Sequence, residues 1–287
     1  MFFCIGAQKA GTTWLYEYLS QSENVHFCAN KELHYFNVRA GYAQEALKLR
    51  IDIVKKISER MDPSNGSLPP NQIARLQEAL DLLRIYSGKG KGPNRHKPYL
   101  DYLLKGRANQ PVVADITPGY AVMNREGFAD MASVGKARFM FIMRDPVSRM
   151  WSQIRMAVKV QNRDETDREK LASACQERAD MLMNSGRLKN IERADYARTI
   201  TELEAAVPPD RIKYIFYENL FGGGAPQEIL DFLEIPEIPF NASKRVNEGM
   251  NLPIPDETAD KFRAAFDKQY KFMRERFGDT LPAGWRT

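Results

Sequence analysis

Short apolar stretches mark the buried strands that this chain is expected to form. One stretch, residues 2–5, ends at Gly6, and another, residues 139–143, ends at Arg144. A further apolar stretch occurs at residues 112–113, and residues 212–216 are apolar except for Lys213. Strands that are apolar at every position are typical of parallel sheets covered on both faces. The pattern therefore predicts a central, mostly parallel sheet.

Apolar residues spaced three to four apart predict helices between these strands. Trp14, Leu15, Tyr18 and Leu19 form such a stripe, which predicts a helix over residues 12–20 that packs on the sheet. Strands that alternate with helices indicate an α/β fold with helices on both faces of the sheet. The same spacing predicts a helix at residues 43–61, a second one after a loop at 63–70 and running through residue 85, two within residues 155–206 that break near 184–186, and one at residues 256–277.

The turn after the first strand has the layout of a phosphate-binding loop. Gly6 is followed by four residues, by Gly11 and then by the predicted helix. Backbone N–H groups of such a loop, together with the helix N-terminus, face an anion. Nucleoside triphosphatases place a lysine directly after the second glycine to reach the outer phosphates. Here Thr12 holds that position and the lysine is Lys9, inside the loop, so the loop is not of the ATPase type.

The strand at residues 139–143 ends in a second anion-binding feature. Arg144 stands at its carboxyl end, where α/β sheets bind their ligands. Asp145 can cap the next helix, and Pro146 suits its first turn. A planar guanidinium can donate two parallel hydrogen bonds to a phosphate. Arg144 is therefore a candidate phosphate ligand.

Residues 30–36, Asn-Lys-Glu-Leu-His-Tyr-Phe, contain a carboxylate and an imidazole two positions apart. In an extended segment this spacing puts Glu32 and His34 on one face. Either group can act as a general base. A glutamate is a weak base unless its surroundings raise its pKa, so we expect Glu32 in a partly desolvated site.

Together these segments resemble the sulfotransferases that use 3′-phosphoadenosine 5′-phosphosulfate (PAPS). Residues 8–15, Gln-Lys-Ala-Gly-Thr-Thr-Trp-Leu, are similar to that family's 5′-phosphosulfate loop. Arg144 and Ser152 match the Arg and Ser with which the family holds the 3′-phosphate. Residues 30–36 resemble the Lys-Glu-x-His-aromatic-Phe segment of the heparan-sulfate branch, in which the Glu is taken as the catalytic base. The resemblance extends from residue 2 to about residue 235.

The resemblance implies a P-loop-like, three-layer fold and metal-free transfer of a sulfuryl group from PAPS to a hydroxyl or amine. The acceptor would be a glycan or a small alcohol, and the product 3′,5′-bisphosphoadenosine (PAP) would leave. Glu32 would be the base, with His34 as the alternative, and Lys9 would neutralise charge on the bridging oxygen. Helical insertions at about 39–110 and 155–206 would shape the acceptor cleft of a single domain, residues 1–287. The cofactor-binding residues that the resemblance implies are Lys9, Ala10, Gly11, Thr12, Thr13, Trp14, Arg144 and Ser152.

The chain departs from the family pattern at several positions. Residues 114–120 look like the family's Glu-Lys-Thr-Pro-x-Tyr segment, but Asp115 replaces the Glu and Ile116 the Lys, so no cationic role transfers there. Asn37 stands where the 3-O-sulfating branch usually has Asp. Residues 212–220 resemble the family's last core strand with its Tyr-Glu-x-Leu ending, which we interpret as structural. Lys244 and Arg245 lie where the family often has a further phosphate-binding segment, although its Lys-Gly signature is missing.

Composition fits one anion-binding domain. The 287 residues include 42 Lys and Arg against 37 Asp and Glu, a net charge of +5 that suits anionic ligands but predicts no nucleic-acid partner. Three cysteines without a spaced framework favour a reducing compartment, and three histidines argue against a catalytic zinc. No segment approaches the roughly 20 apolar residues of a membrane span. We expect no membrane partner, and a cytoplasmic protein or a trimmed catalytic domain.

Two other functions fit parts of the pattern. A P-loop kinase would need a lysine at position 12 and an acidic Mg²⁺ ligand, for which Asp115 and Asp145 are candidates. A non-catalytic module that binds anions or glycans would show a continuous basic face and would not need Glu32. His96 is a weaker candidate base within the glycine-rich, basic segment 87–98, which either closes over a ligand or is a solvated loop.

Overall fold

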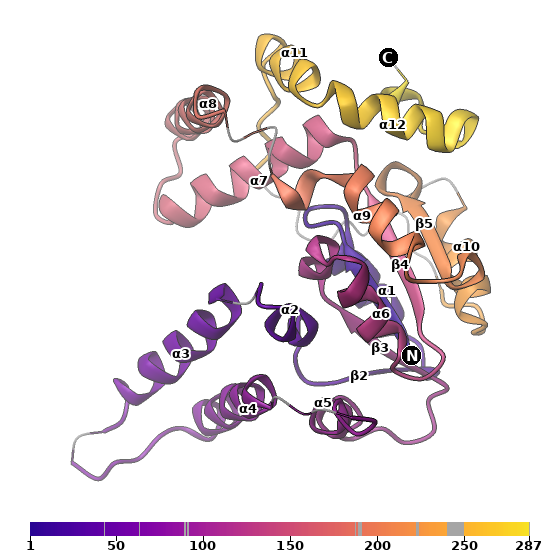
Figure 1. The fold of residues 1–287 in the computed structure, drawn as a ribbon. Helices are drawn as coiled ribbons and strands as arrows, with labels where there is room; N and C mark the ends of the chain where they lie inside the picture. Colours follow the sequence, from indigo (N-terminus) through magenta and orange to yellow (C-terminus); the bar gives the residue numbers. More distant parts are fainter. Residues whose placement is uncertain are drawn as a thin grey trace.

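A five-stranded, fully parallel sheet forms the centre of the protein (Figure 1). The computed structural model describes residues 1–42, 44–62, 64–88, 90, 92–186, 188, 191–221, 224–239 and 250–286. The strand order is β2-β3-β1-β4-β5. The strands are β1 (Phe2–Gly6), β2 (Val25–Phe27), β3 (Val112–Ile116), β4 (Arg138–Met143) and β5 (Ile212–Phe216). The predicted α/β fold is confirmed, and β2 is an additional strand of three residues at the sheet edge.

The position of β1 explains why the phosphate-type loop lies at the centre of the molecule. β1 is fully buried and pairs with β3 on one side and with β4 on the other. Because all strands are parallel, the segments that follow Gly6, Ile116, Met143 and Phe216 leave the same edge of the sheet. This carboxyl edge is where sheets of this kind bind ligands.

Helices flank the sheet and extend beyond it (Figure 1). The predicted helix at 12–20 is α1, and the helices predicted at 43–61 and through residue 85 are α3 and α4. The break predicted near residues 184–186 lies between α8 and α9, whereas the break at residues 162–167, between α7 and α8, was not predicted. The helices are α1 (Thr12–Leu19), α2 (Tyr35–Arg39), α3 (Gln44–Ser58), α4 (Pro70–Ser87), α5 (Lys97–Leu103), α6 (Arg125–Ala132), α7 (Pro146–Gln161), α8 (Arg168–Asn184), α9 (Tyr196–Glu204), α10 (Ala225–Leu233), α11 (Asp256–Ala265) and α12 (Asp267–Phe277).

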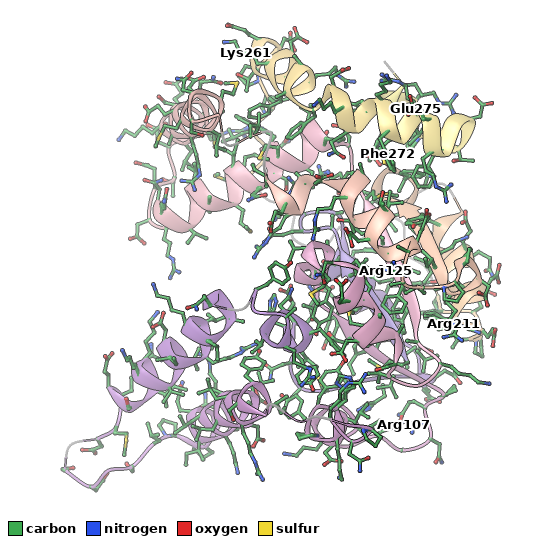
Figure 2. The ribbon with its side chains drawn as sticks, viewed as in Figure 1. Arg107, Arg125, Arg211, Lys261, Phe272 and Glu275 are labelled. Carbon is green, nitrogen blue, oxygen red and sulfur yellow. The ribbon has the colours of Figure 1, made fainter. Side chains whose placement is uncertain are left out.

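The single helix predicted at residues 256–277 is wrong, because the chain breaks at Phe266 into α11 and α12. The break lets the two halves pack on different neighbours. α11 contacts α7 and α8, whereas α12 contacts α9. Charged side chains such as Lys261 on α11 and Glu275 on α12 lie on the outside (Figure 2).

Two hydrophobic clusters hold these layers together. The larger one surrounds the sheet and includes β1 and β4. The smaller one lies between α7, α8 and α11, with Trp151 and Phe262 among its buried side chains. α7 thus begins at the sheet edge and continues into a separate apolar cluster, which fixes the direction in which its polar face points.

A buried carboxylate connects β3 to the sheet edge. Asp115 is 1% exposed and accepts hydrogen bonds from Tyr99 Oη (2.8 Å), Tyr120 Oη (2.9 Å) and Thr117 Oγ1 (2.6 Å). Burial raises the pKa of the Asp115 carboxyl, and the three hydroxyl donors oppose that rise. Buried polar groups of this kind stabilise a fold only while all of their partners are present.

We predict that Asp115→Ala destabilises the protein by about 3 kcal/mol or more, because three buried hydroxyls lose their acceptor. Urea unfolding followed by circular dichroism measures this loss. Asp101→Ala is the control, since that carboxylate is exposed and should change stability by no more than about 0.5 kcal/mol. A loss below about 1 kcal/mol for Asp115→Ala would contradict the assigned role.

Candidate active site

The loop between β1 and α1 has the backbone geometry of an anion cradle. Lys9 and Gly11 both have positive φ, 69° and 88°. A side chain at Gly11 would also collide with the segment that follows β5, because its Cβ would lie 2.7 Å from Leu220 Cδ1. Gly11 is thus required by conformation and by space. The N-terminus of α1, beginning at Thr12, faces the same loop.

Ala10 and Trp14, predicted cofactor-binding residues, have buried side chains. The Trp14 ring stacks on Tyr18 at 5.0 Å between centroids. Only the backbone of these two residues is therefore suited to a ligand, whereas the Thr13 hydroxyl is presented on the site side, where it accepts a hydrogen bond from Lys31 Nζ (3.1 Å).

A cluster of cations surrounds this loop. Arg144 Nη1 donates to the Lys9 carbonyl oxygen (3.2 Å), and Lys9 Nζ lies 3.6 Å from Met156 Sδ. Burial lowers the pKa of the Lys9 ammonium, and the charges of Arg144, Arg155 and Lys31 lower it further. Within the described chain, none of Lys9, Arg144 and Arg155 forms an ion pair with a carboxylate. The site therefore carries an excess of positive charge that an anion would neutralise.

Contacts from three elements fix Arg144 at the end of β4. Its guanidinium lies 4.3 Å from the centroid of the Tyr217 ring. Its carbonyl accepts a hydrogen bond from Tyr196 Oη (2.8 Å). The next residue, Asp145, caps α7 at Ser148 N (2.8 Å), as predicted, and its own N–H donates to Glu218 Oε1 (2.9 Å). The Tyr217-Glu218 turn is thus structural, as expected, and supports the arginine.

Ser152 lies two turns along α7, half-buried, and its hydroxyl makes no hydrogen bond within the described parts of the chain. Ser148, Ser152 and Arg155 share one face of α7 because they are spaced by four and three residues. Arg144 stands one residue before Asp145, the cap of this helix.

Four hydrogen bonds, three of them to the backbone, hold residues 30–33 in place. Leu33 N donates to Thr117 Oγ1 (2.9 Å), and Tyr86 Oη donates to the Leu33 carbonyl. Arg50 Nη2 donates to the Glu32 carbonyl (3.1 Å), and Asn30 Nδ2 donates to Tyr102 Oη (2.6 Å). Arg50, Tyr86 and Tyr102 come from α3, α4 and α5. The insertion helices thus position the segment that carries the candidate base.

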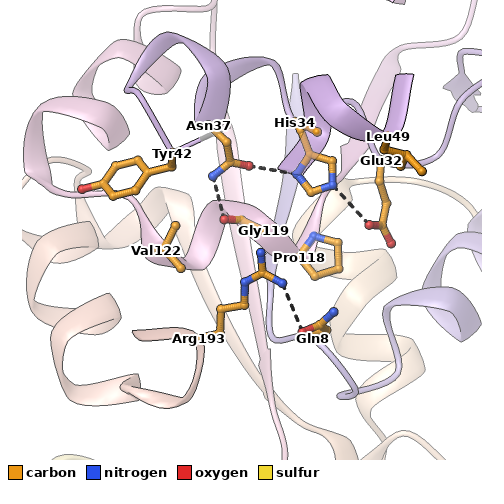
Figure 3. A pocket seen from close by; sticks show the side chains of 11 residues that line it. Gln8, Glu32, His34, Asn37, Tyr42, Leu49, Pro118, Gly119, Val122 and Arg193 are labelled. Atoms are coloured by element: carbon orange, nitrogen blue, oxygen red, sulfur yellow. Dashed lines mark hydrogen bonds and ion pairs between the residues drawn. The ribbon is translucent and has the colours of Figure 1, made fainter. Parts of the chain in front are cut away.

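Glu32, His34 and Asn37 form a hydrogen-bonded row (Figure 3). Asn37 Nδ2 donates to the Gly119 carbonyl (2.8 Å), so Asn37 Oδ1 faces His34 Nδ1 (3.1 Å). His34 Nδ1 must then carry a proton, and Nε2 points at Glu32 Oε2, 3.5 Å away. The row therefore holds Glu32 as the outermost group and His34 behind it.

The pKa of Glu32 differs from the sequence expectation. Burial raises the pKa of the Glu32 carboxyl, but the hydrogen bond to His34 and the charge of Lys31 outweigh burial and lower it below its usual value. Lys31 Nζ lies 3.4 Å from Glu32 Oε1, and the Glu32 side chain is 42% exposed. The neighbouring groups therefore favour the ionised form of Glu32, which can accept a proton. The pKa of its carboxyl is not raised.

A pocket lies directly in front of this row (Figure 3). Gln8 from the loop and Arg193 from the turn Glu192–Ala194 line one side, and Arg193 Nη1 contacts Gln8 Oε1 at 3.5 Å. The remaining lining residues are Glu32, His34, Asn37, Tyr42, Ala46, Leu49, Pro118, Gly119 and Val122. The pocket thus joins the anion loop to the candidate base.

Sequence reasoning did not assign roles to Lys31, Arg155 and Arg193. Lys31 stands beside Glu32 in the motif at residues 30–36, and Arg155 follows Ser152 by three residues. The sequence therefore gave a weak indication that both residues belong to the site. Arg193 had none, because its approach to Gln8 depends on the tertiary fold. Ile116 is fully buried and adds no cation, as its side chain implies.

Other candidates are not at the site. His96 is 5% exposed and lies between Tyr35 Oη and Asp130 Oδ1, at 3.1 Å from each. It has a structural role and does not line the pocket. Lys244, Arg245 and two lysines of the basic segment, Lys89 and Lys91, lie outside the described residues.

Two features are absent from the part of the chain that the structure describes. No group of three or more His, Cys, Asp or Glu is placed to hold a metal ion. No helix in the described ranges has the length and apolar character needed to cross a membrane.

Comparisons with known proteins relate the chain to solved structures and to a family. A crystal structure of a sulfotransferase from Alicyclobacillus acidocaldarius aligns with a TM-score of 0.62 at 17% identity, covering 100% of this chain and 98% of that one, which shows a shared fold. The sulfotransferase domain of the Synechococcus PCC 7002 olefin synthase aligns at 16% identity with a TM-score of 0.42, covering 92% of this chain and 87% of that one. The sulfotransferase domain from the curacin biosynthetic pathway aligns at 14% identity with a TM-score of 0.44, covering 94% and 96%. No curated protein matches the sequence. A family model described as "Sulfotransferase family" matches residues 2–239, and the chain therefore belongs to the sulfotransferase family.

Proposed function

We propose that the protein transfers a sulfuryl group from PAPS to a hydroxyl or amine of an acceptor and releases PAP. One observation carries this proposal: Lys9, Arg144 and Arg155 concentrate positive charge around the β1–α1 loop, and the pocket that Gln8 of this loop lines presents the carboxylate of Glu32. Anion binding and proton acceptance are the two tasks that sulfuryl transfer to an alcohol or amine requires.

The residues present suit PAPS. The loop at Gly11, Thr12 and Thr13 would hold the 5′-phosphate through backbone and hydroxyl donors at a helix N-terminus. Arg144 and Ser152 would hold the 3′-phosphate. Burial and the neighbouring cations lower the pKa of the Lys9 ammonium, and a bound anion would oppose that effect.

The chemistry divides between the two sides of the pocket. Bound PAPS supplies the sulfuryl group, so that a bond forms from the acceptor oxygen or nitrogen to sulfur while the bond from sulfur to the bridging phosphate oxygen breaks. The Glu32 carboxylate accepts the acceptor's proton, and His34, held by its hydrogen bond to Asn37, keeps the carboxylate oriented. Lys9 offsets the negative charge that builds on the bridging oxygen. Lys31, bonded to Thr13 and beside Glu32, adds a second cation between the two sides.

The kinase alternative has little support from the two candidate metal ligands. Asp115 is buried and already accepts three hydroxyl hydrogen bonds. Asp145 caps α7 and accepts a hydrogen bond from Tyr270 Oη (2.5 Å). Neither carboxylate is placed for Mg²⁺, and a purely anion-binding module would have no use for the Glu32–His34–Asn37 row.

We predict that Glu32→Gln lowers turnover by about 10²- to 10⁴-fold, because a positioned general base is lost, and that PAP still binds.

Lys9→Ala should lower turnover by about 10²-fold or more, because the negative charge on the leaving group is no longer stabilised. Transfer of ³⁵S from labelled PAPS, beside calorimetry with PAP, measures both. Glu257→Gln and Lys105→Ala, on exposed side chains, are the matched controls. Wild-type turnover in Glu32→Gln would remove Glu32 as the base and leave His34.

The pH dependence distinguishes Glu32 from His34. The pKa of the Glu32 carboxyl is lowered, so its basic form persists as the pH falls to below 4.5, and kcat/KM should stay level between pH 5.5 and 8. Lys9 acts only while protonated, and its lowered pKa places the loss of kcat/KM with rising pH below pH 10.5. A fall of kcat/KM with falling pH inside this range would instead contradict Glu32 as the base and leave His34 as the candidate.

A further inference from the structure

We propose that Lys31 couples the two sides of the site: an anion held by the β1–α1 loop draws the Lys31 ammonium away from the Glu32 carboxylate, so that Glu32 is released as a base only when the donor is in place. This inference rests on the proposed function and concerns the regulation of the same site. It is carried by one side chain that contacts both the loop and the candidate base.

The Lys31 ammonium is shared between two partners. Its Nζ donates a hydrogen bond to Thr13 Oγ1 (3.1 Å), in the first turn of α1, and lies 3.4 Å from Glu32 Oε1. An ammonium carries three N–H donors on a flexible stem, so these donors can be redistributed while the backbone stays in place. Thr13 is also one of the residues proposed to hold the 5′-phosphate, so an anion bound there would approach the same ammonium.

The backbone on either side of Lys31 is held in place, so that the side chain is the part that can respond. Asn30 Nδ2 donates to Tyr102 Oη (2.6 Å), and Leu33 N donates to Thr117 Oγ1 (2.9 Å). The Lys31 side chain is 22% exposed. A lysine on a fixed segment can therefore exchange one oxygen partner for another at little cost to the fold.

The charges around Lys31 determine which partner it prefers. Lys31 is one of the cations that lower the pKa of the Lys9 ammonium, so its charge lies close to the loop. Lys31 is thus repelled by the cations of the loop and attracted by Glu32. An anion in the loop would offset those cations and replace the repulsion by attraction.

The neighbours of Glu32 explain why this exchange affects proton transfer. Burial raises the pKa of the Glu32 carboxyl, but the hydrogen bond to His34 and the charge of Lys31 outweigh burial and lower it. Arg193 and Tyr42 are the other titratable residues that line the pocket. Since Lys31 is the neighbour that also contacts the loop, donor binding raises the pKa of Glu32 and makes it a stronger base, while His34 keeps the carboxylate oriented.

Titration of the Glu32 carboxyl by ¹³C NMR, with and without PAP, tests the coupling. The protein carries ¹³C-labelled glutamate, and the Glu32 resonance is identified by its absence from Glu32→Gln. We expect PAP to raise the pKa of the Glu32 carboxyl by about 1, which is the effect of losing one neighbouring cation. Because such coupling is reciprocal, PAP should also bind more tightly to protein in which Glu32 is protonated.

Variants of Lys31 separate its effect from the charge of PAP itself. Lys31→Met should show a higher pKa of Glu32 without PAP and a smaller rise with PAP, because the cation that moves is missing. Lys31→Arg keeps the charge and should retain part of the rise. Lys55→Met removes an exposed lysine of α3 outside the pocket lining and should behave as the unaltered protein. Should Lys31→Met not fold, Lys31→Gln gives the same test, since it also removes the charge.

The outcomes separate this inference from the proposed function. A rise that Lys31→Met diminishes and Lys55→Met keeps supports the coupling. An equal rise in Lys31→Met assigns the effect to the charge of PAP, and no rise in the unaltered protein means that Lys31 stays with Glu32. Either result overturns the coupling, and calorimetric binding of PAP then still supports the donor assignment. Failure of PAP to bind in calorimetry overturns the proposed function itself and the coupling with it.

Discussion

The site depends on positive charge that gathers at the carboxyl edge of the sheet and is not neutralised there. Lys9 and Arg144 are joined through the Lys9 carbonyl, and Arg155 lies close enough to lower the pKa of the Lys9 ammonium. Such cations repel one another. They stay together because Tyr217, Tyr196 and the Asp145 cap hold the end of β4, and because the tight loop at Gly11 leaves no freedom to separate. An anion with two charged ends would relieve the repulsion, which explains how the fold and the proposed donor fit each other.

Hydrogen bonds to the protein core hold the opposite side of the pocket in place. A path of hydrogen bonds runs from buried Asp115 through Thr117 to the backbone of Leu33, directly beside Glu32. Arg50 and Tyr86, from the insertion helices, hold the same segment from the other side. The base therefore stands on a rigid segment, although its side chain is partly exposed. A polar network inside the core thus supports the chemistry at the surface, since rigid support keeps reacting groups in position.

Local sequence patterns predict much of this structure, and contacts between distant segments determine the rest. The apolar stretches, the glycine spacing of the loop and the cap at Asp145 each follow from neighbouring residues, so the fold, the loop and the position of Arg144 were predictable. The break at Phe266 was not, because an unbroken apolar stripe continues through it and only packing against α7, α8 and α9 separates the halves. The lowered pKa of Glu32 was also missed, since it results from His34 and Lys31 together with a row fixed by Gly119, more than 80 residues away. Arg193 meets Gln8 across 185 positions, beyond any local pattern.

Calorimetric binding of PAP, with and without Mg²⁺ and beside Mg-ATP, tests the central claim most directly. The account predicts metal-independent PAP binding that exceeds Mg-ATP binding, that weakens about tenfold or more in Arg144→Ala through loss of a charge-assisted phosphate contact, and that is unchanged in Arg75→Ala, an exposed arginine on α4. Preference for Mg-ATP, or PAP binding that Arg144→Ala leaves unchanged, would contradict it.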